Sequence, residues 1–264
     1  MSIRKKAPAE DIRQERKNLI NSQSDFYILE AYKSLRTNVM FSLTGKEGCK
    51  VILLTSSMQG EGKSTTAVNL AISFALDGKK VLLVDCDMRR PKLARLMGLR
   101  SNIGLSNILL RPELCGSALL PTAEKNMRVL LAGDIPPNPS ELLGSPRMNE
   151  LIDALKKQFD YIILDTPPVN VVTDAMVLCP LTDGVLFVVR SGIAERGSVM
   201  RAVDQIERTK TKLLGFILNG VEGKSRSYGH YGKYGGYGYG YAYAENPVSP
   251  DVRSGKINRR VDGQ

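Results

Sequence analysis

The sequence predicts an α/β fold with a mostly parallel central sheet flanked by helices. Short apolar runs alternate with helical patterns of ten or more residues through the middle of the chain, which is typical of βαβ units. The 264 residues are 42% apolar and 24% charged, enough for one large domain or two small ones. No window approaches the roughly 18 consecutive apolar residues of a membrane span, and no signal-peptide core follows the charged start. We therefore expect a protein that is neither secreted nor inserted in a membrane.

The expected elements follow from apolar periodicity and from helix-ending signals. A helix over 25–42 is amphipathic, because its apolar residues recur at spacings of three and four. A helix over 64–77 would be closed by Gly78 in the left-handed conformation. Further helices are expected over 140–158 and 194–209. The apolar residues of the first helix are Phe26, Leu29, Leu35, Val39 and Met40, and the strands are expected at 50–55, 80–84, 127–132, 161–164, 185–189 and 213–218.

The two ends of the chain differ in composition from the middle. Of the net charge of +10, residues 1–20 carry +3 and residues 223–264 carry +4. After Val221 the chain becomes rich in glycine and tyrosine, so it cannot bury a core and should be disordered. We expect a basic, flexible N-terminus over 1–24, a single folded domain over 25–221 and a disordered C-terminal tail over 222–264. The tail's tyrosine cluster is Tyr228, Tyr231, Tyr234, Tyr237, Tyr239, Tyr241 and Tyr243.

The first expected strand runs into SSMQGEGKST at 56–65 and then into a helix, the setting of a phosphate-binding loop (P-loop). Glycines let successive backbone N–H groups point at phosphate oxygens, and the helix adds its positive end. Lys63 would reach the β- and γ-phosphates, and Ser64 would offer its hydroxyl to Mg²⁺. Ser57 replaces the usual first glycine; a chance glycine-rich turn is the alternative, which the flanking elements disfavour. The expected nucleotide-binding residues of the loop are Gly60, Glu61, Gly62, Lys63, Ser64 and Thr65.

Two other apolar runs end in acids. VLLVDCD places Asp85 and Asp87 at i and i+2, which share one face in an extended chain, at the strand end where α/β sheets bind ligands. YIILDTPP ends in Asp165 and matches a Walker B strand, whose Asp organises Mg²⁺. Solvated acids in strand-ending turns are the alternative. Together with the P-loop, these acids indicate a Mg-nucleotide site.

Cysteine and histidine chemistry has few candidates here. The cysteines form no CxxC motif and no metal-ligand spacing, so they are interpreted as small buried hydrophobes, Cys86 included. His230 is the one histidine and lies in the Gly/Tyr tract, which argues against His-based zinc sites and nucleophile pairs. The four cysteines are Cys49, Cys86, Cys115 and Cys179.

Four segments together resemble the bacterial protein-tyrosine kinases (BY-kinases) of the capsular-polysaccharide type. They are the P-loop, VDCDMRRP, IPPNPSELLGS at 135–145 and FDYIILDTPP, and the similarity runs from about Glu30 to Val221. The resemblance implies a P-loop NTPase-like fold and an autokinase that uses ATP and Mg²⁺ to phosphorylate its C-terminal tyrosine cluster. Lys63 and Ser64 would be the Walker A residues, with Ser64, Asp87 and Asp165 at the metal. A tyrosine hydroxyl, with a pKa near 10, gains from a carboxylate that accepts its proton, and Asp85 is the candidate base.

The resemblance also implies an assembly motif. Glu30, Lys33 and Arg36 match the family's E-x2-R-x2-R pattern for ring assembly, with Lys33 in place of the first Arg. An exposed ion pair on the helix is the alternative. Asn219 matches a position near the adenine base in related ATPases. Asp174 is either a family position or the N-cap of a helix that begins at Ala175.

The implied function is regulation of capsular or exopolysaccharide synthesis and export by a cytoplasmic autokinase. A transmembrane adaptor of the polysaccharide co-polymerase type would recruit and activate it at the inner face of the membrane, and a cognate tyrosine phosphatase would reverse the reaction. The alternative is a positioning or partition-type P-loop ATPase that switches partners with nucleotide state. Its usual second lysine is replaced by Ser57-Met58. Nucleic acid is not an expected partner, because only three cations, Lys224, Arg226 and Lys233, intersperse the tyrosines.

Overall fold

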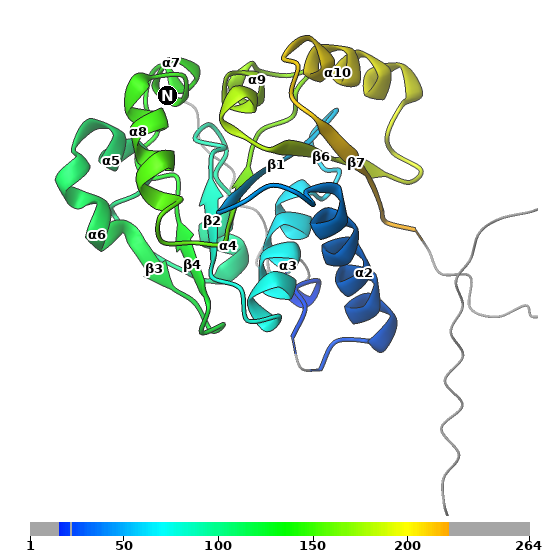
Figure 1. Ribbon diagram of the computed structural model, residues 1–264. Helices are drawn as coiled ribbons and strands as arrows, with labels where there is room; N and C mark the ends of the chain where they lie inside the picture. The colour runs from blue at the N-terminus through cyan, green and yellow to red at the C-terminus, as the bar shows by residue number, and fades with distance from the viewer. Residues whose placement is uncertain (1–15, 22, 222–264) are drawn as a thin grey trace, which may run out of the picture. The chain divides into compact units, whose positions relative to one another are not determined.

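A seven-stranded sheet forms the centre of the molecule (Figure 1). The structure is a computed structural model that describes residues 16–21 and 23–221. The strand order is β3-β4-β2-β5-β1-β6-β7, and all neighbours pair in parallel except β3, which runs antiparallel to β4. The strands are β1 (Lys50–Ser56), β2 (Val81–Asp85), β3 (Leu119–Pro121), β4 (Met127–Leu130), β5 (Tyr161–Asp165), β6 (Gly184–Arg190) and β7 (Leu213–Asn219). The prediction of an α/β fold with a mostly parallel sheet is confirmed.

Helices cover both faces of the sheet, as Figure 1 shows. One core cluster joins the sheet to α2, α3 and α4, and the other joins it to α5, α8, α9 and α10. The longer helices are α2 (Phe26–Ser42), α3 (Lys63–Leu76), α8 (Pro146–Leu155) and α10 (Arg196–Arg208). The short ones are α4 (Leu93–Met97), α5 (Leu105–Leu110), η1 (Pro112–Leu114), α6 (Cys115–Ala118), α7 (Pro139–Leu143), α9 (Asp174–Leu178) and η2 (Cys179–Leu181).

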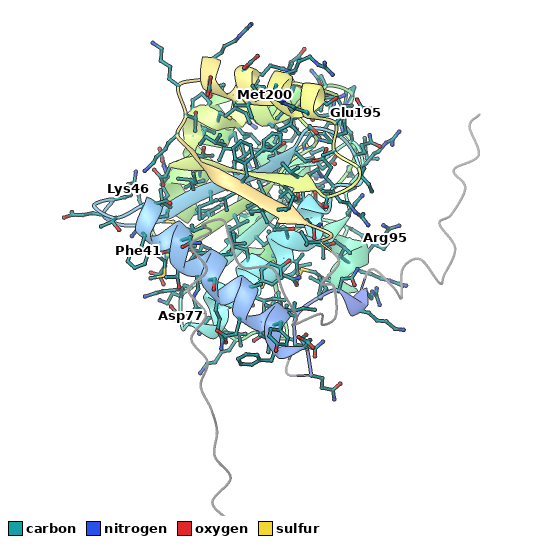
Figure 2. All side chains as sticks on the ribbon, turned by 90° about the vertical axis from the view of Figure 1, so that its right-hand side faces the viewer. Phe41, Lys46, Asp77, Arg95, Glu195 and Met200 are labelled. Atoms are coloured by element: carbon teal, nitrogen blue, oxygen red, sulfur yellow. The ribbon has the colours of Figure 1, made fainter. Side chains whose placement is uncertain are left out.

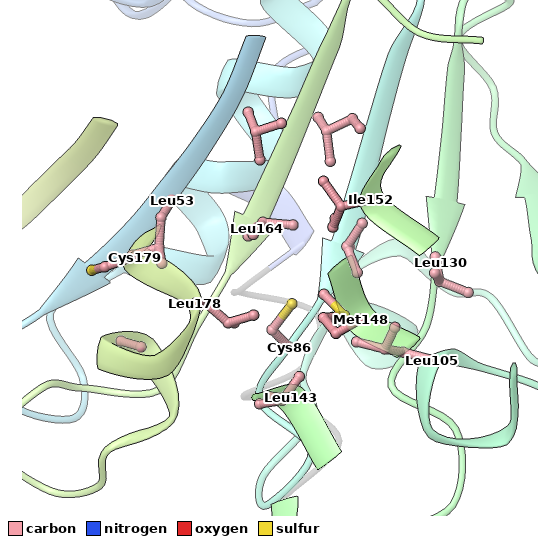
Figure 3. Packing of buried hydrophobic residues seen from close by; sticks show 14 of the residues in the cluster. Leu53, Cys86, Leu105, Leu130, Leu143, Met148, Ile152, Leu164, Leu178 and Cys179 are labelled. Atoms are coloured by element: carbon pink, nitrogen blue, oxygen red, sulfur yellow. The ribbon is translucent and has the colours of Figure 1, made fainter. Parts of the chain in front are cut away.

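Strand β1 shows why the central strands read as continuous apolar runs. Val51 and Leu53 face one core cluster, while Ile52 and Leu54 face the other, and all four are fully buried. A strand buried on both faces has no polar side to alternate with. On the α8 and α9 side, Cys86 lies between Leu178 and Met148 (Figure 3), so its interpretation as a packing residue is confirmed.

The strand order brings three loop-bearing strand ends together. Strand β5 lies between β2 and β1, so the loops after these three strands lie at one edge of the sheet. In this register Asp85 at the end of β2 pairs with Asp165 at the end of β5. Because parallel sheets bind ligands at the carboxyl ends of their strands, a ligand-binding site is expected at this edge.

The helix expected over 140–158 is wrong in one respect, since it is two helices, α7 and α8. The break falls at Gly144-Ser145-Pro146. Ser145 is extended, as a residue before proline prefers, and Pro146 lacks an N–H and therefore begins the second helix. The short helices α4, α5 and α6 and the three-residue strand β3 were not predicted, because elements this short carry little periodicity.

The N-terminal end of the folded domain begins earlier than residue 25. The side chain of Asn69 accepts a hydrogen bond from the backbone N–H of Ile20 and donates one to the carbonyl of Asn18. Ile20 is only 4% exposed and belongs to the core cluster of α2 and α3. Residues 18–20 are thus packed against α3, while residues 1–15 and 22 lie outside the described part.

The predicted amphipathic helix exists as α2, with Asp25 as its N-cap, but its apolar face is only partly covered. Val39 is buried, whereas Phe26 and Met40 are exposed. Phe41 is 74% exposed and lies on the surface at the C-terminal end of the helix (Figure 2). No described helix is both long enough and apolar enough to cross a membrane. The tail over 222–264, with its seven tyrosines, lies outside the described residues.

Candidate active site

The loop after β1 has the backbone of a phosphate-binding loop. Gly60 and Gly62 both have positive φ, 85° and 91°, so the chain curls in a way that side-chain-bearing residues rarely adopt. Gly62 is the N-cap of α3, which begins at Lys63, and a Cβ at Gly62 would collide with the side chain of Asn219. The loop therefore has the glycine conformations, and the helix start directly after it, that anion-binding loops use.

Glu61 explains why serine stands at the first position of this loop. Its Oε1 accepts a short hydrogen bond from the Ser57 hydroxyl and a second from the backbone N–H of Met58, 2.9 Å away. Glu61 is 1% exposed, and its Oε2 has no hydrogen-bond partner. A glycine at position 57 would lack the hydroxyl that donates to this buried carboxylate, so Ser57 and Glu61 form an internal brace that ties the start of the loop to its middle.

Lys63 and the predicted acids lie together at the strand ends. The Nζ of Lys63 is 3.5 Å from Oδ2 of Asp87 and 3.8 Å from Oδ1 of Asp165. Burial by itself would lower the pKa of Lys63, but the carboxylates of Asp165, Asp87 and Asp85 outweigh burial and raise that pKa. The lysine therefore stays charged where a phosphate would sit.

Asp85 and Asp165 are both fully buried, and they differ in their partners. Asp85 accepts hydrogen bonds from the backbone N–H groups of Asp87, Lys92 and Leu93 at 3.1–3.2 Å. Neither oxygen of Asp165 has a hydrogen-bond partner. Burial raises the pKa of Asp85 to about 8, with the nearby charge of Asp165 adding to it. Burial raises the pKa of Asp165 as well, and Lys63 opposes that rise.

A magnesium ion fits the orphaned carboxylate. Carboxylate and hydroxyl oxygens are the ligands that Mg²⁺ prefers, and it commonly binds through one or two carboxylates together with phosphates and water. Asp165 supplies two unsatisfied oxygens, and Asp87 and Ser64 lie beside Lys63 at the same edge. Among the described residues no group of three or more His, Cys, Asp or Glu side chains forms a ready-made cage. The donor set therefore suits a metal that arrives with a nucleotide.

The site opens into a cavity of about 1260 Å³. This exceeds the roughly 300–1,000 Å³ of common small-molecule sites, which leaves room for a nucleotide and a second group. Asp87 lines the cavity, whereas Asp85 and Asp165 lie behind its wall. The cationic residues of the lining outnumber its acids and favour an anionic ligand. They are Lys17, Lys63, Arg89, Arg90, Lys92 and Arg190, against Asp25 and Asp87.

Asn219, at the end of β7, lies beside the phosphate-binding loop. Its Nδ2 donates a 3.0 Å hydrogen bond to the carbonyl of Glu61, and it lines the cavity with Gly220 and Val221. Arg190 adds a contact that the sequence did not suggest, a 2.9 Å hydrogen bond to the carbonyl of Gly60. Contact of Asn219 with a base stays a prediction.

The three residues predicted for assembly do not act together within one chain. Glu30 and Lys33 form an exposed ion pair with a 2.6 Å N–O distance. Arg36 turns inward instead, donating to the carbonyl of Ser73 at 2.7 Å and pairing with Asp77 at 3.1 Å. Assembly through these residues stays a prediction.

The sequence did not identify the polar cluster formed by Arg89, Asp174 and Ser140. Arg89 binds Asp174 through two nitrogens, and Ser140 contacts both. Asp174 is not a helix N-cap, because Thr173 holds that position and the Asp174 carboxylate faces Arg89. Arg89 follows the two acids in DCDMRR, but nothing in the sequence points to its partner 85 positions later.

The fold and the loop define the class of protein first. A family model described as an AAA domain matches residues 49–215, and the chain is a nucleotide-binding P-loop protein of that family. The septum site-determining protein MinD of Pyrococcus horikoshii, solved in complex with Mg-ADP, shares 25% identity and a TM-score of 0.55, covering 64% of this chain and 70% of that one.

Closer similarities define the family within that class. The tyrosine-protein kinase YwqD of Bacillus subtilis strain 168 is 42% identical over 204 residues, 77% of this chain and 86% of the relative. The crystal structure of the chimerical protein CapA2B2 superposes with a TM-score of 0.73 at 36% identity, covering 80% of this chain and 98% of that one. The chain belongs to the bacterial tyrosine-protein kinases.

Proposed function

We propose that this kinase uses Mg-ATP to phosphorylate the tyrosines of its own tail and thereby regulates capsular or exopolysaccharide synthesis and export. The observation that carries the proposal is that Val221, the last described residue, lines the same cavity as Lys63 and Asp87. The tyrosines follow Val221 by 7 to 22 residues. At about 3.4 Å per residue, such segments reach roughly 24–75 Å, so the chain's own site and a neighbour's are both within range.

Each residue of the site has a part in the transfer. The N–H groups of the loop and Lys63 hold the phosphates and offset the charge that builds up as the γ-phosphoryl group moves. When bound, Mg²⁺ would supply further charge neutralisation, held by Ser64, Asp87 and Asp165. Asn219 would contact the base.

The proton of the attacking tyrosine goes to a carboxylate, and two acids compete for that role. Asp85 is the base that the family resemblance implies, yet its oxygens are occupied by three backbone N–H groups and it lies behind the cavity wall. Asp87 lines the cavity and is the acid that a bound tyrosine would meet first. Loss of the pH dependence of the transfer rate in Asp85→Asn supports Asp85, and its loss only in Asp87→Asn supports Asp87.

The tail would act as a charge switch. Residues 223–264 carry +4, and phosphorylation of all seven tyrosines would add roughly −10 to −14. Such tails repel one another, so we propose a homo-oligomer, a ring in the simplest case, that dissociates on phosphorylation and re-forms through a phosphatase. An oligomer of unchanged mass after complete modification, measured by light scattering, would contradict the switch.

The membrane enters the proposal through an adaptor. A transmembrane activator of the polysaccharide co-polymerase type would recruit the kinase to the inner face of the membrane and raise its activity. The partition-type ATPase, the second candidate of the sequence, is not favoured, because the MinD structure is a more distant match than CapA2B2.

The test is phosphosite mapping on the purified full chain. The protein is incubated with Mg-ATP, alone and with a membrane fraction from its source cells, and phosphate is located by mass spectrometry. We expect phosphotyrosine within 228–243 and none in Lys63→Met, with Lys80→Met, an exposed lysine before β2, as the matched control. No phosphate in 228–243 under either condition would refute the autokinase, and phosphate in Lys63→Met would refute the assigned site.

A further inference from the structure

We propose that Arg89 and Asp174 are a positioning pair, which holds the turn that carries Asp87 in the position where Asp87 can bind the metal. The proposal rests on the metal-side role proposed above for Asp87. Arg89 donates from Nε to Oδ2 of Asp174 at 2.9 Å and from Nη2 to Oδ1 at 3.0 Å. This two-point fork fixes the guanidinium in orientation as well as distance, which a lysine cannot do.

The pair fastens three segments that are far apart in the sequence. Arg89 belongs to the turn after β2, and Asp174 begins α9, 85 positions later. Ser140 of α7 accepts from Arg89 at 3.0 Å and donates a short hydrogen bond to Asp174. Thr173 donates to the Ser140 hydroxyl at 3.2 Å. Ser140 lies in the segment IPPNPSELLGS, which is part of the family resemblance. This segment therefore supplies the third member of the cluster, beside Arg89 and Asp174.

Two neighbouring arginines hold the turn through different partners. Arg90 donates from its backbone N–H to Oδ1 of Asp87 at 3.0 Å and from its side chain to Gln59 of the phosphate loop at 2.7 Å. Arg89 binds Asp174 instead. The backbone that presents Asp87 to Lys63 is therefore anchored both to the phosphate loop and to α9, and loss of either anchor frees it to shift.

The two members of the pair are not equivalent in burial. The Asp174 side chain is 0% exposed and the Arg89 side chain is 39% exposed. Removal of Arg89 leaves a buried carboxylate without its counter-charge, which is costly, whereas Arg89 left alone can be hydrated. Replacement of both removes the buried charge and should restore much of the folding stability. A merely structural pair would then recover its activity as well, and a positioning pair would not.

The experiment uses Arg89→Gln, Asp174→Asn, the double variant and Ser140→Ala in the full chain. Asp153→Asn is the matched control, because it breaks an exposed pair with Lys156 on the same face of the sheet. Melting temperature, kcat and KM for tail phosphorylation and the Kd of a fluorescent ADP analogue with and without Mg²⁺ are measured. We expect the melting temperature of Arg89→Gln to lie roughly 5–15 °C below that of the unmodified protein, and that of Asp174→Asn to fall by less.

The double variant distinguishes a positioning pair from a merely structural one. We expect its melting temperature to return toward that of the unmodified protein while kcat stays at least about tenfold low, with KM little changed. Recovery of the full rate together with stability would overturn the proposal. If Arg89→Gln alone loses ADP affinity in the absence of Mg²⁺, Arg89 contacts the nucleotide directly and the positioning role is wrong.

The nucleotide measurement separates this proposal from the proposed function. If the unmodified chain forms no phosphotyrosine, the autokinase fails, and the pair is still tested by ADP binding. We expect Mg²⁺ to tighten ADP binding in the unmodified protein and to do so at least about tenfold less in Asp174→Asn, because Asp87 is misplaced. An unchanged effect of Mg²⁺ would overturn the positioning pair.

Discussion

The ends of β2 and β5 lie side by side and end in the same residue type, yet they serve different purposes. Asp85 and Asp165 are paired in register and are both fully buried. After β2 the chain turns back into α4, and the N–H groups of Lys92 and Leu93 point at Asp85. After β5 comes Thr166, whose N–H donates to Leu54, and then two prolines, which have no N–H to donate.

The difference leaves one of the two acids at this sheet edge without a hydrogen-bond donor among the described residues. A buried carboxylate without donors costs free energy in the empty protein, so it persists where something else completes it. The backbone N–H groups of Asp87, Lys92 and Leu93 donate hydrogen bonds to Asp85, and these bonds stabilise the turn. The charge of Asp165 is offset only in part, by Lys63. We infer that a bound metal ion offsets the remainder of that charge.

The largest expected effect comes from matched Asp→Asn changes at these two positions. We expect Asp165→Asn to lower the rate of tyrosine phosphorylation about 100-fold or more, because the metal loses a ligand whose charge is worth several kcal/mol. The unfolding free energy of the nucleotide-free protein should fall less than it does in Asp85→Asn, because the Asp165 carboxylate accepts no hydrogen bond from the described backbone and loses only its charge interaction with Lys63. Radiolabelled ATP transfer and urea denaturation measure the two quantities.

The matched variant Asp85→Asn should lose more stability in the nucleotide-free protein than Asp165→Asn does. Its amide group faces backbone N–H groups, so we expect the unfolding free energy to fall by about 1–3 kcal/mol. If instead Asp165→Asn destabilises the empty protein more than Asp85→Asn does, the contrast between the two strand ends is wrong.

Glu61 is an intermediate case, because one of its oxygens is satisfied and the other is not. We expect Ser57→Gly to destabilise the nucleotide-free protein by about 1–3 kcal/mol, since it removes the hydroxyl that holds a buried carboxylate. The double change Ser57→Gly with Glu61→Val removes the acid as well and should recover most of that loss. Thermal unfolding with and without ADP gives both values.

Equal stability of the single and double variants would show that the brace between Ser57 and Glu61 has no energetic role. Ser42→Gly, at the C-terminal end of α2, is a control for the general effect of glycine on the unfolded chain.

Much of this region was predictable from the sequence, and the reason is local. Each parallel strand was predicted from an apolar run, and Asp85, Asp87 and Asp165 lie at the ends of two of those runs. The unpartnered state of Asp165 could also have been inferred from Pro167 and Pro168. The fork between Arg89 and Asp174 could not, because its members are 85 positions apart and neither breaks a local pattern.

The pH dependence of stability tests the coupling of the two buried acids. In the folded, nucleotide-free protein the pKa of Asp85 is about 8, above its ordinary 3.8. A raised pKa means that the folded state binds the proton more tightly, so this contribution is complete below about pH 4 and is lost as the pH rises through 8. We expect the unfolding free energy to fall between pH 6 and pH 9, by no more than about 1.4 kcal/mol per pH unit.

Asp165→Asn should weaken this dependence, because it removes the neighbouring charge that helps to raise the pKa of Asp85. Urea denaturation at pH 6, 7, 8 and 9 measures it. A stability that stays constant over this range would mean that the acids are already ionised in the empty protein and that the N–H groups around Asp85 outweigh its burial.

The smallest effect is expected where the acid is exposed. Glu30 pairs with Lys33 on α2, and their side chains are 43% and 56% exposed. We expect Glu30→Ala to change the unfolding free energy by at most about 0.5 kcal/mol, because solvent screens such pairs. Arg36→Ala should cost more, since Arg36 is mostly buried and binds Ser73 and Asp77. If Glu30→Ala also lowers the oligomer mass in light scattering while stability is unchanged, the acid serves a neighbouring copy, as the assembly prediction requires. An unchanged mass would show that Glu30 and Lys33 are only a solvent-exposed ion pair. Glu30 would then differ from the buried Asp85 and Asp165, whose roles depend on the groups around them.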